Sequence, residues 1–167
     1  MRTLIAGVGM PDLDDPPLSK RLRESLAHDA PISAARVVIE DLSSDPVEAA
    51  RRLDSEWPRF ERVILVGEVA RERPPGTIAA YRWDGESGSE SSHDGVAHFD
   101  STLLALRELA DVPDELVVVE VEPEVRHAGS TTASNASFTR ARSLLRRLAT
   151  SSQAVADLPL TSLGGTP

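Results

Sequence analysis

Two glycines and three aspartates near the start of the chain are the first residues whose types and spacing could do chemistry. Gly7 and Gly9 follow a short apolar run, and Asp12, Asp14 and Asp15 come next. Glycines after a strand are typical of phosphate-binding loops, but a dinucleotide fingerprint requires a third glycine where Asp12 stands. A phosphate would meet like charge there instead of backbone N–H groups. The sequence therefore argues against a nucleotide cofactor, and it has no Gly-x-x-x-x-Gly-Lys-Ser/Thr run.

Composition and charge narrow the functional class further. The chain has 167 residues, 40% of them hydrophobic, which is enough for one domain with its own core. Its formal net charge of -9 argues against nucleic acid, because binding to a phosphate backbone needs a basic patch. The absence of cysteine excludes disulfides, cysteine-based zinc sites and a cysteine nucleophile. The first apolar run is too short for a signal peptide or a membrane span, so we expect a cytoplasmic protein.

The elements that must position these residues follow from hydrophobic periodicity. Apolar runs predict strands at 3–8, 35–41, 62–69, 76–83 and 115–122. Apolar residues at helical spacing predict helices from Leu18, from Pro46, over 101–110 and over 137–149. Asp45 is expected to cap the second of these, which would bury Val47, Ala50 and Leu53.

Strands that alternate with helices predict an α/β fold with a mostly parallel sheet covered on both faces. We expect one domain over residues 1–150, a surface loop over 84–95 and a loosely held tail over 151–167. In such folds ligands bind beyond the carboxyl ends of the strands. This rule selects residues 10–15, 67–72 and 122–129 as candidate site segments.

Four stretches in a fixed order resemble one family. They are "LIAGVGMPDLDD", "RVILVGEVARERPPGTIAAYR", "HFDSTLLALRELADVPDELVVVEVEPE" and "FTRARSLLRRL". Together they are similar to the hydrogenase maturation endopeptidases, over about residues 3–150. The resemblance implies a three-layer αβα sandwich around a twisted, mostly parallel five-stranded sheet. It also implies an enzyme that trims the C-terminus of the large-subunit precursor of a nickel–iron hydrogenase.

The same resemblance implies a metal site, and this sequence departs from the family's pattern there. The family uses a carboxylate in the first loop, an aspartate after the central strand and a histidine ahead of the next helix. Aligned without a gap, the first ligand falls on Pro16, next to Asp15, and the second on Gly67, next to Glu68. The histidine position suits His93 or His98.

A slip of one residue would offer Asp15, Glu68 and one histidine as a mixed oxygen and nitrogen site. Such a site suits nickel, which the precursor itself would carry, or another divalent metal such as zinc. A shift of one residue along a strand turns a side chain to the opposite face, so Glu68 can serve only where the strand ends or bulges. The site prediction is therefore Asp15, Glu68 and His98 as catalytic residues, with these three and His93 as metal ligands.

Each of these residues also has a plainer interpretation. Asp15 precedes two prolines and a helix, so it could be an N-cap. Glu68 could pair with Arg71. His93 lies in a serine-rich loop and could be solvated. His98 near a helix start would be favoured as a neutral imidazole, which suits a metal ligand, or it could cap or pack.

Three functions remain open from the sequence. The leading one is an endopeptidase in which bound or substrate-borne metal polarises the scissile carbonyl or activates water. The alternative is a catalytically inactive relative that binds a hydrogenase subunit as an assembly factor, because Gly67 and Pro16 stand at expected ligand positions and Pro17 replaces a glycine. The third is a small-molecule hydrolase or binder that uses Tyr81 or Trp83. None of the three needs nucleic acid or a membrane span.

Overall fold

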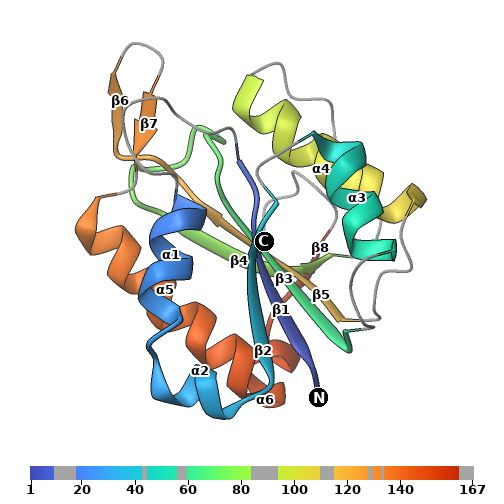
Figure 1. Cartoon of the computed structure of the whole chain (residues 1–167). Coiled ribbons are helices and arrows are strands. Elements are labelled where there is room, and N and C mark those ends of the chain that lie inside the picture. The colour runs from blue at the N-terminus through green and yellow to red at the C-terminus, as the bar shows by residue number, and fades with distance from the viewer. Residues whose placement is uncertain are drawn as a thin grey trace.

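The computed structural model of the chain describes residues 1–9, 18–42, 45–55, 60–83, 94–109, 115–127, 130–132 and 134–161. These residues form a three-layer α/β sandwich with a central sheet between two groups of helices (Figure 1). The predicted fold class is therefore confirmed.

The strands are β1 (Thr3–Gly7), β2 (Val37–Asp41), β3 (Arg62–Glu68), β4 (Ile78–Trp83), β5 (Glu115–Val121), β6 (Val125–His127), β7 (Ser130–Thr132) and β8 (Leu160–Thr161). The helices are α1 (Leu18–Leu26), α2 (Ala30–Ala34), α3 (Pro46–Ser55), α4 (Asp94–Leu109), α5 (Asn135–Thr150) and α6 (Ser152–Ala156). The hairpin β6–β7 and the short helix α2 have no counterpart among the predicted elements.

The main sheet has the strand order β2-β1-β3-β5-β4-β8. All neighbouring strands are parallel except β4, which runs antiparallel to β5. The five predicted strands are β1 to β5, and β8 adds a short sixth strand next to β4. It comes from the segment expected to be loosely held, in which Val155 of α6 is also buried. This part of the tail packs because the apolar side of α6 covers the sheet next to α5.

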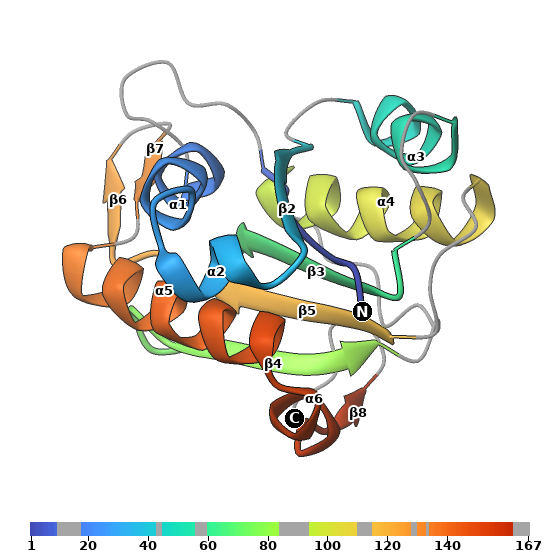
Figure 2. The ribbon, with the colours of Figure 1, turned by 60° about the horizontal axis from the view of Figure 1, so that its bottom comes forward.

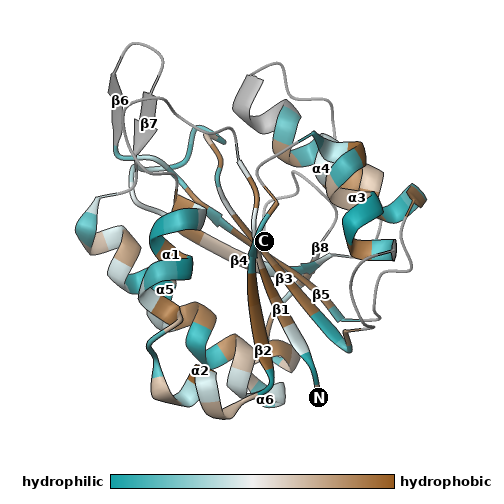
Figure 3. Ribbon diagram, in the orientation of Figure 1, coloured by the Kyte–Doolittle hydropathy of each residue, from teal (hydrophilic) through white to brown (hydrophobic). Residues whose placement is uncertain are grey.

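Apolar side chains fill both faces of the sheet. On one face, α3 and α4 pack over a core that includes Leu65, Val118 and Leu103. On the other face, α1, α2, α5 and α6 pack over a core that includes Ile64 and Val117. Figure 3 shows the apolar strands at the centre and the polar outer sides of the helices. A strand buried on both faces must read as a continuous apolar run, which is how β3 was recognised.

The predicted start of α3, which has a capping residue, agrees with the structure, whereas the predicted start of α4 does not. Asp45 caps α3 as predicted: its Oδ1 accepts the backbone N–H of Val47 at 2.9 Å and of Glu48 at 3.2 Å. Val47 itself is 40% exposed, and Ala49 is buried in its place. The expected inward position of Val47 was therefore wrong.

The helix expected over 101–110 is longer than predicted. α4 already begins at Asp94, inside the polar stretch that was expected to be a loop. Leu103 and Leu106 are buried, whereas Leu109 is 47% exposed at the end of the helix. Within the part of the chain that the structure describes, no helix is long and apolar enough to cross a lipid bilayer.

Candidate functional site

The carboxyl ends of the parallel strands β1, β3 and β5 lie together at one end of the sheet, and α4 covers one face there. Gly67 is the register partner of Glu120 on β5, so the two positions share a face. On the other side of β3, the N–H of Val8 donates to the carbonyl of Val66 at 2.8 Å, which continues β1 alongside Gly67. Val8, Gly67 and Glu120 thus form one row at the edge where α/β folds bind ligands.

Gly67 is a glycine because the ring of Phe99 occupies the space above it. A Cβ at this position would lie 2.6 Å from the carbonyl oxygen of Val8 and 2.7 Å from two ring carbons of Phe99. Phe99 itself is only 1% exposed. The position at which the resemblance places an aspartate ligand therefore has no room for a side chain while Phe99 stays where it is.

Glu68 follows Gly67 on an unbroken strand. The parallel ladder continues through Glu68, whose register partner is Val121. Val121 packs in the core on the α1/α5 side of the sheet, so Glu68 projects from that face and not from the face of α4. β3 shows no bulge at this point, and Glu68 is its last residue. Its assignment as ligand or catalytic residue stays a prediction that requires its side chain to reach round the strand end.

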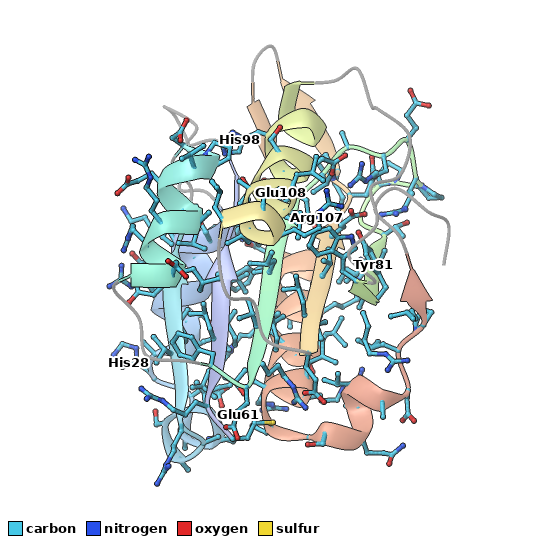
Figure 4. All side chains as sticks on the ribbon, turned by 90° about the vertical axis from the view of Figure 1, so that its right-hand side faces the viewer. His28, Glu61, Tyr81, His98, Arg107 and Glu108 are labelled. Carbon is cyan, nitrogen blue, oxygen red and sulfur yellow. The ribbon has the colours of Figure 1, made fainter. Side chains whose placement is uncertain are left out.

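His98 lies in the second turn of α4, next to Phe99. Its carbonyl accepts the hydroxyl of Thr102 at 3.0 Å, and its ring Nε2 is buried without a hydrogen-bond partner among the described residues. Figure 4 shows His98 at the carboxyl end of β3, whereas Glu61, which precedes β3, lies at the opposite end. Because α4 begins at Asp94, His98 does not stand at the helix start where the sequence placed it.

The other two predicted site residues, Asp15 and His93, lie outside the described residues. Within the described ranges no group of three or more histidine, aspartate or glutamate side chains is placed to hold a metal ion. The Nε2 of His98 could supply one nitrogen ligand, but Gly67 has no side chain and supplies no ligand. The described residues alone do not fit a complete resident metal site.

A buried network of charges occupies the same edge of the sheet beside the Val8–Gly67–Glu120 row. Arg71 donates to Oε1 of Glu120 from Nη2 at 2.7 Å and from Nε at 3.1 Å. It also binds both carboxylate oxygens of Asp100 on α4, at 2.6 and 3.0 Å. Arg73 donates to the second oxygen of Glu120 at 2.6 Å, and the hydroxyl of Tyr81 donates to Oε1 at 2.9 Å. Together these contacts tie the β3–β4 connection to β5 and to the start of α4.

The protonation states follow from this geometry. Burial alone would raise the pKa of Glu120, but the hydrogen bonds and charges of Arg71 and Arg73 outweigh it and lower that pKa. Burial, followed by the negative charge of Glu120, raises the pKa of Tyr81. Burial would lower the pKa of Arg71, yet Asp100 and Glu120 raise it. Glu120 is therefore ionised and Tyr81 protonated at neutral pH.

Sequence reasoning did not assign this network to the site. It named Arg71 only as a possible partner of Glu68, and Tyr81 only as a residue that could line a pocket. A usable signal was present in "ELVVVEV", because Glu120 continues the alternating positions of Leu116 and Val118, which face the core. An acid at such a position requires cationic partners, and two arginines follow the neighbouring strand.

A second polar cluster lies where β4 begins. Glu124 accepts the hydroxyls of Ser134, at 2.7 Å, and of Ser137 through Oε1, and these contacts lower the pKa of Glu124. Gly76, at a φ of 77°, passes so close that a Cβ would lie 2.5 Å from the same oxygen. The residues beside it form an open cavity of about 420 Å³, lined by Pro75, Gly76, Thr77, Ile78 and Arg140.

Comparisons with known proteins place this architecture. No protein-family model matches the sequence, and no curated protein matches it significantly. Several solved structures match it over most of both chains, and three of them are described next. One is an endopeptidase from Escherichia coli, with a TM-score of 0.57 and 22% identity over 95% of this chain and 96% of that one.

The second is the hydrogenase maturating endopeptidase HybD from E. coli, with a TM-score of 0.55 and 21% identity over 87% of this chain and 90% of that one. The third is the [NiFe] hydrogenase maturation protease HycI from Thermococcus kodakarensis KOD1, with a TM-score of 0.55 and 16% identity over 93% of each chain. The resemblance predicted from the sequence is confirmed at the level of the fold. The chain has the fold of the hydrogenase maturation endopeptidases.

Proposed function

We propose that this protein is an endopeptidase of the hydrogenase-maturation type, which removes the C-terminal extension of a nickel–iron hydrogenase large-subunit precursor. The observation that carries the proposal is His98, whose buried ring nitrogen is unbonded among the described residues at the carboxyl edge of the sheet. The likeness of fold to solved endopeptidases supports it, because the match extends over most of both chains.

In this proposal the nickel belongs to the substrate. The precursor brings the metal to the edge formed by β1, β3 and the start of α4, where Nε2 of His98 is the free nitrogen. Asp15, Glu68 and His93 are proposed as further contacts from neighbouring segments. The Arg71–Glu120 network would hold the β3–β4 connection in place while a peptide lies across this edge, because its charges are fixed by several hydrogen bonds.

The test is a cleavage assay with a large-subunit precursor prepared with and without nickel. We expect C-terminal cleavage, read by mass spectrometry, that requires nickel in the precursor and falls at least a hundredfold in His98→Gln and Asp15→Ala. His28→Gln is the matched control, because His28 is an exposed histidine on the opposite side of the molecule from α4 (Figure 4). No cleavage of the nickel-loaded precursor by the wild-type chain would refute the enzymatic proposal.

A second candidate function is favoured by one observation, the contact of Phe99 with Gly67. It makes the protein a non-catalytic relative that binds the same precursor as an assembly factor. This candidate predicts that the precursor is retained in a pull-down without being cut, and that Asp15→Ala and His98→Gln retain it equally well. A precursor that is released after cleavage would exclude it.

A further inference from the structure

The outer edge of β4 is paired over only part of its length within the described chain. β8 pairs with β4 at Arg82 and Trp83, the last two of its six residues. Figure 2 shows β8 and α6 beside this end of β4, and neither element extends along the other end. Over Ile78 to Tyr81, none of the described strands pairs with the outer side of β4. An unpaired strand edge is a template for another extended chain.

The direction of the backbone groups on this edge follows from one printed hydrogen bond. The N–H of Arg82 points outward, because it donates to the carbonyl of Pro159 at 2.8 Å. Backbone groups alternate along a strand, so the N–H and C=O of Ile78 and Ala80 point to the same outer side. Those of Ala79 and Tyr81 point inward to β5, with which both residues are in register.

A cation stands beside the unpaired stretch. Arg140 of α5 lines the cavity next to Ile78, and its Nη2 donates to the carbonyl of Gly76 at 2.8 Å and to the hydroxyl of Ser137 at 3.0 Å. These contacts fix the guanidinium, while its Nε and Nη1 have no partner among the described residues. The nearby carboxylate of Glu124 already accepts hydroxyl groups from two serines, and the charge of Arg140 contributes to lowering its pKa without a direct hydrogen bond between the two. Among the described residues that line the cavity, Arg140 is the charged one.

We propose that the edge of β4 from Ile78 to Tyr81, together with the cavity beside Arg140, binds an extended acidic peptide of a partner protein as an additional strand. Main-chain hydrogen bonds to Ile78 and Ala80 would give affinity, as in other cases of strand addition. The free N–H groups of Arg140 would select a carboxylate side chain by charge complementarity.

The occupant is a partner peptide and not the chain's own C-terminal segment. β8 runs parallel to β4 and pairs Leu160 with Arg82 and Thr161 with Trp83, so at Thr161 the chain is directed away from Ile78. Residues 162–167 also contain no acidic side chain. The edge lies one strand beyond Glu120, so it is separate from His98, and peptide binding there does not depend on the proposed peptidase activity.

The first test measures binding of a fluorescein-labelled eight-residue peptide of alternating valine and threonine with one central glutamate. A matched peptide carries glutamine in place of the glutamate. In fluorescence anisotropy we expect saturable one-to-one binding of the glutamate peptide and about tenfold weaker binding of the glutamine peptide. Arg140→Gln should weaken only the glutamate peptide, about tenfold. Arg146→Gln on the exposed side of α5 is the control with the same charge change and should leave both affinities unchanged.

The second test locates the peptide by amide hydrogen exchange in NMR spectra, with an internal control in the same strand. Saturating glutamate peptide should slow exchange at Ile78 and Ala80 and leave Ala79 and Tyr81 unchanged, because the latter two already face β5. Thermal melting of Arg140→Gln checks that the variant is folded.

The proposal is overturned if the peptide does not bind, or if it binds without protecting Ile78 and Ala80. It is also overturned if binding appears only after residues 162–167 are removed, since the chain's own tail would then be the occupant. If the free chain sediments as a dimer, and the amide of Ala80 is already protected from hydrogen exchange in that dimer, the edge binds a second copy of the chain instead. The cleavage assay above does not enter any of these outcomes.

Discussion

Two arginines, one buried and one partly buried, stand at opposite ends of β3 and are held in different ways. Arg62 begins the strand and is 0% exposed. It donates to the carbonyl of Leu148 at the end of α5, at 2.6 Å, and to Glu115 at 2.7 Å. Arg71 follows the strand and donates to Glu120 and Asp100. Glu115 is 41% exposed in its side chain, whereas Glu120 is 0% exposed.

The difference shows that Arg62 has a structural role, whereas Arg71 belongs to the candidate site. Arg62 satisfies carbonyls that the last turn of α5 leaves unpaired, and its other partner is reached by water. Its role is to attach a helix end to the sheet. The charges around Arg71 depend on one another, because Glu120 has no access to solvent and faces two arginines. Such a cluster holds the carboxyl edge of the sheet in one arrangement, beside His98 and Phe99.

The largest expected effect is therefore the loss of Glu120. Glu120→Gln removes the buried negative charge that Arg71 and Arg73 share, and we expect a loss of about 3–5 kcal/mol in the free energy of unfolding. Urea denaturation at neutral pH measures it. The matched control is Glu115→Gln, which removes the water-exposed partner of Arg62 and should cost about 1 kcal/mol or less. Equal losses in the two variants would show that burial of the carboxylate does not distinguish the two ends.

The next largest effect is expected at the other end of β3. Arg62→Met keeps the volume of the stem but removes the donors to Leu148 and Glu115, and we expect a loss of about 2 kcal/mol. The end of α5 should lose protection in amide hydrogen exchange, while the residues around Glu120 keep theirs. If amide protection falls first near Glu120, Arg62 also stabilises the opposite end of β3, and its role is not limited to attaching the end of α5.

How much the sequence could predict depended on whether a feature is local or rests on contacts between distant segments. The fold followed from patterns that are local and repeated: apolar runs for the strands, leucines at helical spacing and the cap at Asp45. The family resemblance rested on the order of such pieces, and the architecture agrees with it. The start of α4 was missed because residues 94–100 contain no leucine, so the leucine repeat that marks the rest of the helix gives no signal there.

The site was harder because it depends on contacts between segments far apart in the sequence. Glu120 lies 49 residues from Arg71 and 47 from Arg73, and no local pattern pairs them. The glycine at position 67 is explained only when the ring of Phe99 is placed above it. The face of Glu68 depended on whether β3 ends or bulges, which register with β5 decides. His98 was predicted from the sequence, and its ring Nε2, which has no hydrogen-bond partner among the described residues, keeps it the central candidate.

A smaller effect is expected from a methyl group at Gly67, beside the Arg71 cluster. Gly67→Ala would press on the Val8 carbonyl and the Phe99 ring, and we expect a loss of about 1–2 kcal/mol in the free energy of unfolding. The control is Gly9→Ala, since a Cβ there meets nothing within 4 Å among the described residues. Phe99→Leu should relieve part of the loss in the double variant. A Gly67→Ala variant as stable as the wild type would mean that the ring of Phe99 yields readily, which would reopen this position to a ligand side chain.

The smallest effect is a dependence on pH that belongs to the Arg71 end alone. The folded protein holds the pKa of Glu120 below its ordinary value of 4.5. Glu120 therefore contributes stability that is present above the unfolded pKa and is lost as pH falls through the lower, folded pKa. The difference in unfolding free energy between wild type and Glu120→Gln should narrow below about pH 4.5, measured by urea denaturation at constant ionic strength. A difference that stays constant or widens in acid would mean that Glu120 is not held ionised by its arginines, and the two ends of β3 would then differ in burial but not in charge.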